Sequence, residues 1–75
     1  MKPKVISDTP INRIKAVLAE IRVTQKELAK RVKRTETTIS RICKNENQPT
    51  LALLREIAIA LNVDICELLV PVKPK

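Results

Sequence analysis

The stretch TQKELAKRVKRTETTISRI, residues 24–42, contains two helix starts that decide the fold. Thr24 and Glu27 have the spacing of a capping box, in which a hydroxyl and a carboxylate satisfy main-chain N–H groups at a helix start. Thr35 offers a second hydroxyl cap after only a two-residue connection. The pattern predicts one short helix that ends near Val32 and another that starts at Thr35. Two helices joined so tightly are expected to cross at a steep angle.

Apolar and polar residues divide these two helices into an inner and an outer side. The inner side carries five aliphatic residues at helical spacing: Leu28, Ala29, Val32, Ile39 and Ile42. The outer side of the second helix carries hydroxyls, a carboxylate and cations: Glu36, Thr37, Ser40, Arg41 and Lys44. These side-chain types match the major groove of DNA, where Arg binds guanine, Glu accepts from cytosine and Thr contacts the thymine methyl group.

The segment before residue 24 predicts a further helix. Thr9 and Pro10 form a favourable helix start, with the hydroxyl as the cap and proline in the first helical position. Five apolar residues then recur inward before Arg22: Ile11, Ile14, Val17, Leu18 and Ile21. Residues 1–8 are expected to form a flexible basic arm.

The segment after the central stretch predicts two more helices. Residues 44–49 form a polar loop, and Thr50 then caps a longer helix with its own inward set: Leu51, Leu54, Ile57, Ala58 and Leu61. A second capping box at residues 64–67 predicts a short fifth helix. The domain is therefore expected to span residues 9–70, followed by an extended tail at residues 71–75.

Positive charge is concentrated in the middle of the chain. The 75 residues carry a formal net charge of +7, from 15 Lys and Arg against 8 Asp and Glu. Residues 22–44 hold eight of the cations and only two of the anions. This distribution is typical of a protein that binds a polyanion such as nucleic acid. A solvated face of ordinary solubility charges is the simpler alternative.

The composition does not indicate an enzyme or a metal site. There is no histidine and no glycine, so a Gly-rich phosphate loop is excluded. Cys43 and Cys66 are too few for a zinc site and are expected to be reduced packing residues. We therefore expect neither a cofactor nor a metal. With no apolar signal sequence or membrane span, a cytoplasmic location is expected.

The segments TQKELA, TTISRI and QPTLALLREIAIAL follow one another at a spacing that resembles the XRE family, which includes Cro and the lambda-type repressors. The resemblance covers residues 11–69. It implies an all-α, five-helix, lambda-repressor-like fold in which predicted helices 2 and 3 form a helix-turn-helix. It also implies sequence-specific binding of double-stranded DNA by a transcriptional regulator, most simply a repressor.

The resemblance further implies roles for individual residues. Base reading is assigned to three residues of the third predicted helix: Glu36, Thr37 and Arg41. Contact with the phosphate backbone, or support of that contact, is assigned to eight residues: Gln25, Thr35, Thr38, Ser40, Lys44, Asn45, Asn47 and Gln48. Four of these roles have simpler alternatives. Gln25 and Thr37 can be solvent-facing residues without a contact to DNA. Glu36 can act only as a carboxylate at a helix N-terminus, and Arg41 can pair with Glu46 or another surface anion.

Three positions depart from the family pattern. Lys33 stands where the turn glycine is usual, and a left-handed conformation there costs a non-glycine residue about 1 kcal/mol. Asn45 replaces a second common glycine, although asparagine tolerates positive φ better than most residues. Arg34 replaces a usual apolar residue and is expected to add a cation near phosphate.

Three apolar residues exceed what the inner face of the fourth predicted helix requires: Ala52, Leu53 and Ile59. Surplus apolar surface on a small domain predicts a partner. That partner is either a second copy, giving a homodimer on a near-palindromic operator, or another protein, as in antitoxins and in controllers of restriction–modification operons. Alternatively, residues 5–6 or 70–72 of the same chain cover this surface.

Overall fold

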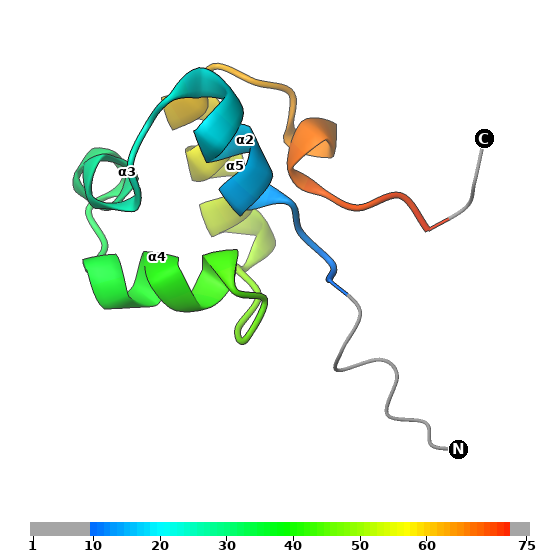
Figure 1. Cartoon of the computed structure of the whole chain (residues 1–75), viewed down its shortest axis with the longest axis horizontal. Coiled ribbons are helices and arrows are strands. Elements are labelled where there is room, and N and C mark those ends of the chain that lie inside the picture. Colours follow the sequence, from blue (N-terminus) through cyan, green and yellow to red (C-terminus); the bar gives the residue numbers. More distant parts are fainter. Residues whose placement is uncertain (1–9, 73–75) are drawn as a thin grey trace.

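The computed structural model describes residues 10–72, and the elements of this part of the chain are all helices, without a β-strand. In chain order its elements are α2 (Ile14–Ile21), α3 (Gln25–Val32), α4 (Glu36–Cys43), α5 (Leu51–Leu61) and the 3₁₀ helix η1 (Ile65–Leu68). In Figure 1, α3 lies at the left, α4 across the bottom and η1 at the right, with α2 in front of α5. The predicted basic arm at residues 1–8 lies outside the described residues.

The prediction of an all-α fold is confirmed, but the count of five α-helices is not. The described residues contain four α-helices, and the fifth predicted segment is the single 3₁₀ turn η1. Its predicted cap is present, since Asp64 Oδ1 accepts from Cys66 N at 3.1 Å. Leu69 is already extended, at φ −115° and ψ 150°. The turn is therefore too short for the hydrogen bonds of an α-helix to develop.

Threonine hydroxyls start three of the helices, as the sequence predicted. Thr24 accepts from the N–H of Glu27 at 3.0 Å, and Thr35 and Thr50 each accept at 3.1 Å from the residue three positions ahead. In the predicted capping box the carboxylate of Glu27 takes a different partner, the Nε of Arg31 at 3.2 Å. The hydroxyl half of the box is confirmed, whereas the Glu27 carboxylate binds a side chain one turn later in the same helix.

Three of the helices end in left-handed residues, although the chain contains no glycine. Arg22, Lys33 and Asn62 end α2, α3 and α5 with φ values of 60°, 58° and 57°. At each end the cap N–H and the next N–H bond back to carbonyls of the last turn, which is the Schellman pattern. The left-handed turn expected at Lys33 is confirmed, and so is the positive φ expected at Asn45, which is 62°.

The first helix starts later than the sequence predicted. α2 begins at Ile14, so Pro10 and Ile11 precede it, and Thr9 lies outside the described residues. The side-chain oxygen of Asn12 accepts from Ile14 N at 3.1 Å and satisfies the first helical N–H from inside the protein. Ile11 was predicted to face inward but is 50% exposed. A buried asparagine therefore sets the helix start in place of the Thr-Pro pair.

The inward face of α5 also differs from the prediction. Leu53 is 7% exposed and belongs to the core, whereas Leu51 is 80% exposed. The assignment of Leu53 to a partner surface and of Leu51 to the core is therefore wrong. Leu53, Ile57 and Leu61 recur every four residues along one line of the helix, and Leu51 lies outside that line.

One contiguous core joins all five elements. Each element contributes at least one fully buried aliphatic side chain: Ile14, Leu28, Ile39, Ile57 and Leu68. Burial of a side chain of this size contributes about 1.5–3 kcal/mol. Ile21, predicted to face inward, is instead 39% exposed at the end of α2. The core packs α4 from its inner side only, so its other side is left for solvent or a ligand.

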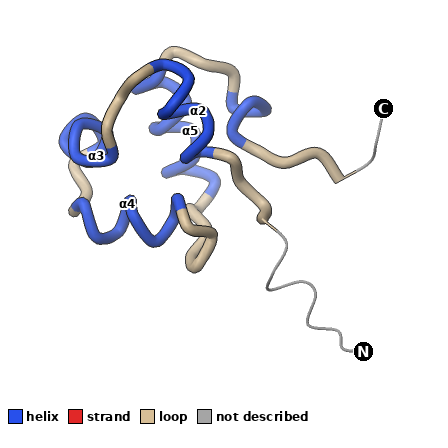
Figure 2. The backbone as a smooth tube through the Cα atoms, viewed as in Figure 1, coloured by secondary structure: helices blue, strands red, loops and turns tan. Residues whose placement is uncertain are grey.

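The segment before α2 pairs with the segment after η1. Val70 N donates to Ile11 O at 2.8 Å, and Asn12 and Leu69 form an isolated antiparallel bridge. Figure 2 shows these two segments next to each other on the side opposite α3. The bridge brings both ends of the domain together near the start of α2.

Candidate nucleic-acid interface

Helices α3 and α4 form a helix-turn-helix. In Figure 1, α3 is seen almost end-on while α4 lies across the view, so the predicted steep crossing is present. Ala29 is 4% exposed on the inner side of α3, and its carbonyl accepts from Arg34 N at 2.9 Å. The left-handed Lys33 makes this return of the chain possible within two residues.

The outer side of α4 is a polar surface with a shallow hollow of about 370 Å³. Ile39, Ile42 and Cys43 face the core on the opposite side of this helix. Five of the six residues that line the hollow were predicted from the sequence, and Glu46 is the addition: Glu36, Thr37, Ser40, Arg41, Lys44 and Glu46. Within residues 10–72, the side chains of the five predicted residues form no hydrogen bond or ion pair. The described part of the fold therefore leaves these side chains uncommitted.

Arg41 stands without an anionic partner in the described part of the chain. The alternative ion pair with Glu46 does not form there, and the two residues meet only through the main chain, where Glu46 N donates to Arg41 O at 2.9 Å. Glu36 is the first residue of α4, a position that favours a carboxylate and also leaves its oxygens exposed. Within residues 10–72, no acceptor uses the N–H groups of the Arg41 guanidinium.

Thr35 and Thr38 share one hydrogen-bonded pair at the start of α4. The Thr35 hydroxyl accepts from Thr38 N at 3.1 Å and donates to the Thr38 hydroxyl at 2.9 Å. Thr38 still has its own hydroxyl proton to donate, whereas Thr35 is used by the cap. Gln25, the first residue of α3, is half-buried, and its amide group has no partner within residues 10–72.

The loop after α4 contains three predicted phosphate contacts with different surroundings. Asn45 is half-buried, and its side-chain oxygen accepts from Ile11 N at 2.9 Å and from Asn12 N at 3.0 Å. Gln48 is exposed, but its side-chain oxygen accepts from Asn12 Nδ2 at 2.8 Å. The side chain of Asn47 is exposed and forms no hydrogen bond within residues 10–72. Of the three amides, only that of Asn47 is uncommitted.

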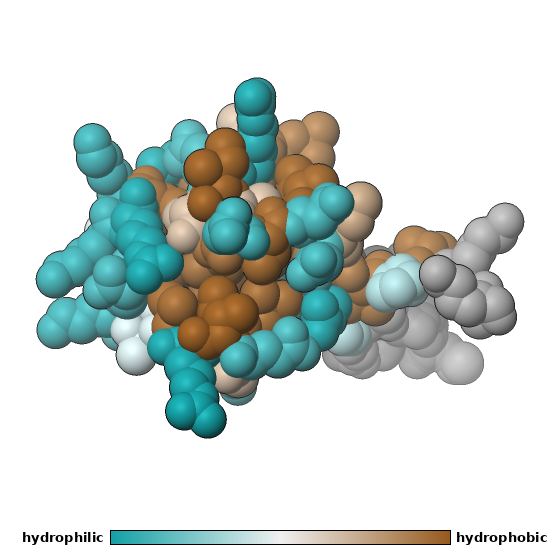
Figure 3. All heavy atoms as spheres, turned by 90° about the horizontal axis from the view of Figure 1, so that it is seen from above, coloured by the Kyte–Doolittle hydropathy of each residue, from teal (hydrophilic) through white to brown (hydrophobic). Residues whose placement is uncertain are grey.

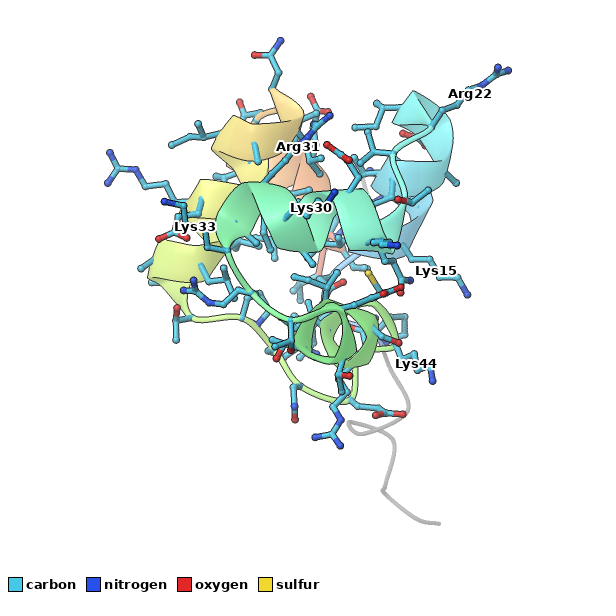
Figure 4. All side chains as sticks on the ribbon, turned by 90° about the vertical axis from the view of Figure 1, so that its left-hand side faces the viewer. Lys15, Arg22, Lys30, Arg31, Lys33 and Lys44 are labelled. Carbon is cyan, nitrogen blue, oxygen red and sulfur yellow. The ribbon has the colours of Figure 1, made fainter. Side chains whose placement is uncertain are left out.

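Lys15 joins the surface from another helix and was not identified from the sequence. Figure 4 shows Lys15 of α2 and Lys44 after α4 projecting toward the same side of the molecule. Burial raises the pKa of the Cys43 thiol, while the charge of Lys15 lowers it, so the ammonium group lies near the end of α4. The sequence places Lys15 on the exposed side of α2. Only the fold shows that the C-terminal end of α4 lies beside it.

Two cations of the central stretch are used inside the fold instead. Arg31 donates to the carbonyl of Ala60 in α5 at 3.0 Å, and Figure 4 shows its side chain directed toward that helix. Arg34 donates to Val32 O at 3.0 Å and lies 3.9 Å from a carboxylate oxygen of Glu56. The expected role of Arg34 near phosphate therefore competes with contacts that direct it toward α5.

The outer side of α5 contains the remaining predicted surface. Ala52 is exposed and Ile59 is 70% exposed, whereas Leu53 is buried. A second hollow, of about 300 Å³, lies between α3 and α5 and is lined by six residues: Arg31, Val32, Lys33, Glu56, Ile59 and Ala60. Figure 3, seen from the side away from α4, shows apolar residues at the centre of the face and hydrophilic ones gathered at the α3 end.

Residues 10–72 contain no group of three or more Cys, Asp and Glu side chains placed to hold a metal ion. None of the helices in this part is long and apolar enough to cross a membrane.

Comparison with known proteins identifies the family. A model of the helix-turn-helix family matches residues 14–68, which include every element from α2 to η1. The comparison with curated proteins finds no match. Among solved structures, the chain is similar to the crystal structure of a proposed DNA-binding protein from Bacteroides fragilis, with 47% identity, coverage of 79% of this chain and 95% of that chain, and a TM-score of 0.77. The chain therefore belongs to the helix-turn-helix family, of the XRE type.

Proposed function

We propose that this protein binds double-stranded DNA in a sequence-specific manner and regulates transcription, most simply as a repressor that covers a promoter. The observation that carries the proposal is the outer side of α4, where five polar side chains have no partner within residues 10–72 while the inner side is locked in the core. A helix held in this way can lie in the major groove, which is wide enough to admit it. The similar protein from Bacteroides fragilis, itself a proposed DNA-binding protein, supports the same function.

The proposed base contacts come from three exposed residues of α4. Arg41 offers a guanidinium that can donate two parallel hydrogen bonds to guanine, and Glu36 offers a carboxylate that can accept from cytosine. Thr37 offers a methyl group to thymine. Each good two-bond contact discriminates against a wrong base by about 1–3 kcal/mol, so Arg41 is expected to dominate specificity.

The proposed phosphate contacts lie around this helix. Gln25 and Thr38, in the first turns of α3 and α4, have donors without an acceptor among residues 10–72, and the main-chain dipoles there also favour an anion. Lys15 and Lys44 supply positive charge on one flank (Figure 4), and Asn47 supplies an uncommitted amide in the loop. Phosphate contacts fix the orientation of the protein on DNA without reading its sequence.

We further propose that two copies act together on a near-palindromic operator. Recognition helices of a two-fold dimer lie about 34 Å apart, one turn of DNA. The α3–α5 hollow with the exposed Ile59 is the surface we assign to the second copy. Sedimentation of the protein on its operator is expected to show two copies, and Ile59→Glu is expected to reduce this to one. Leu51→Glu changes an equally apolar exposed residue away from this hollow and serves as the control.

The same exposed Ile59 favours a second candidate function, an antitoxin or a restriction–modification controller that binds another protein here. If Ile59→Glu leaves the copy number on DNA unchanged, the second-copy assignment is wrong and this alternative gains support.

The direct test of the proposed function is selection of bound duplexes from a random pool. We expect one enriched sequence with two-fold symmetry, and fluorescence anisotropy should then show at least about 10³-fold tighter binding to it than to random DNA. A pool without enrichment, or equal affinity for selected and random duplexes, would overturn sequence-specific recognition.

A further inference from the structure

Asn12 is the only buried polar residue in the described part of the chain, at 2% exposure. Its side-chain oxygen accepts from Ile14 N at 3.1 Å, and its Nδ2 donates to Ile42 O at 3.0 Å and to Gln48 Oε1 at 2.8 Å. One amide group therefore joins the start of α2, the last turn of α4 and the loop that follows α4. All of its hydrogen-bonding atoms are used, as expected for a polar group inside a protein.

Asn45 completes the same network from the loop side. Its Oδ1 accepts from the main-chain N–H groups of Ile11 and Asn12, at 2.9 and 3.0 Å, and from Gln48 Nε2 at 3.1 Å. Its Nδ2 donates to Asn12 O at 3.1 Å. The side chain of Asn45 thus binds both the main-chain N–H and the main-chain oxygen of Asn12, although the two residues are 33 apart in sequence.

The backbone of Asn45 shows why the side chain matters. With φ at 62° it adopts a conformation that glycine reaches more readily than any residue with a Cβ atom. A glycine would make the turn but could form none of the four side-chain hydrogen bonds. The presence of asparagine at this position is therefore explained by the network rather than by the turn.

We infer that the Asn12–Asn45–Gln48 network positions the C-terminal end of α4 and thereby contributes to operator discrimination, an inference that rests on the DNA-binding function proposed above. The N-terminal end of α4 is held by α3 through the short turn. The C-terminal end, with Arg41 and Lys44 on its outer side, is tied to α2 by this network. A displacement of about 0.5–1 Å is enough to spoil two-bond contacts with a base edge. Asn45 and Gln48 then act as positioning residues rather than as phosphate contacts.

The experiment compares Asn45→Gly with Asn47→Ala. The first substitution removes the four side-chain hydrogen bonds of Asn45, suits the positive φ and leaves the charge unchanged. The second removes an amide of the same loop that forms no hydrogen bond within residues 10–72. Affinities for the selected operator and for a random duplex of equal length are measured by fluorescence anisotropy at one salt concentration.

Asn45→Gly is expected to weaken operator binding about tenfold and to change random-duplex binding less than about twofold, because positioning affects base contacts and not charge. Asn47→Ala is expected to weaken both duplexes by a similar factor. Equal losses on both duplexes for Asn45→Gly, or no loss on either, would overturn the positioning role.

A second readout needs no DNA. In the free protein, the amide hydrogens of Ile11 and Asn12 are expected to exchange with solvent at least about tenfold faster in Asn45→Gly, because both lose their acceptor. Unchanged exchange would refute the network itself. If the wild-type protein binds no duplex, the proposed function fails, while the exchange result still decides whether the network holds the two segments together.

Discussion

Arg31 ties α3 to α5, since its guanidinium donates to the main-chain oxygen of Ala60 at 3.0 Å while its Nε donates to Glu27 at 3.2 Å. A cation in the most basic stretch of the chain thus stabilises the fold. Arg31→Ala is expected to lower the free energy of unfolding by about 1–2 kcal/mol, because the carbonyl loses a charged donor at a partly exposed site. Urea denaturation measures the loss. Lys30→Ala, at the neighbouring exposed position, is expected to change stability by less than about 0.5 kcal/mol, and an equal loss in both variants would contradict this role for Arg31.

Arg41 and Lys44 are about one turn apart on the same side of α4, but Arg41 is proposed to contact a base and Lys44 to contact phosphate. Arg41→Ala is expected to lose about 1–3 kcal/mol of discrimination at one base pair, because a guanine loses its two donors. Lys44→Ala is expected to weaken all duplexes alike and to reduce the salt slope by about 1. Anisotropy titrations over a range of salt concentrations separate the two effects. Identical behaviour of the two variants on operator and random DNA would refute the assignment.

Lys33 has a left-handed backbone in the turn between α3 and α4, with φ at 58°. Lys33→Gly is expected to stabilise the protein by about 0.5–1 kcal/mol. Glycine avoids the clash of Cβ with the carbonyl oxygen, and this gain exceeds the cost of the greater conformational entropy that glycine gives the unfolded chain. Lys30→Gly, inside α3, is the matched control and is expected to destabilise by about 1 kcal/mol. Thermal denaturation gives both values, and a loss of stability in Lys33→Gly would show that the turn does not have this conformation.

Leu53 and Leu51 test the rotation of α5. Leu53→Ala is expected to cost about 2–5 kcal/mol, because it leaves a cavity beside a residue that is 7% exposed. Leu51→Ala is expected to cost less than about 0.5 kcal/mol at a site that is 80% exposed. A larger loss of unfolding free energy in Leu51→Ala than in Leu53→Ala, measured by urea denaturation, would support the inward face predicted from the sequence.

The Cys43 thiol links stability to pH. Burial raises its pKa above the ordinary value, with a smaller opposing effect from the charge of Lys15. A raised pKa in the folded state means that the thiol favours folding fully below the pKa of the unfolded thiol, about 8.5, and loses this contribution as the pH rises. The difference in unfolding free energy between the wild type and Cys43→Ala is therefore expected to shrink between pH 8 and pH 10. A constant difference would show that the thiol is not desolvated.

Local signals in the sequence predicted most of the helix-turn-helix. The hydroxyl caps at Thr24 and Thr35 and the alternation of apolar and polar positions depend only on neighbouring residues, so α3 and α4 were placed correctly. The start of α2 was missed because the Asn12 side chain, which accepts from Ile14 N, is held in place by Ile42 and Gln48, 30 and 36 positions away. No local pattern encodes such a contact.

The polar face of α4 was predicted. Which of the surrounding residues are used inside the fold, and which stay exposed, was not predicted. The run of apolar residues at the start of α5 fits two helix faces, and only packing selects the one with Leu53. In the same way, the sequence indicates only surface cations at Arg31 and Arg34. Their contacts with α5 appear only in the folded structure. Lys15 was overlooked because its distance from Lys44 depends on how α2 and α4 pack.

The measurement that tests the central claim most directly is the change in amide chemical shifts when the selected operator is added to labelled protein. We expect the largest changes at residues 36–47 and at Gln25, with little change at the exposed Glu67 of η1, which lines neither the α4 hollow nor the α3–α5 hollow. Changes centred on α5, with α4 unaffected, or no change at low salt, would contradict the claim that the polar side of α4 lies in the major groove.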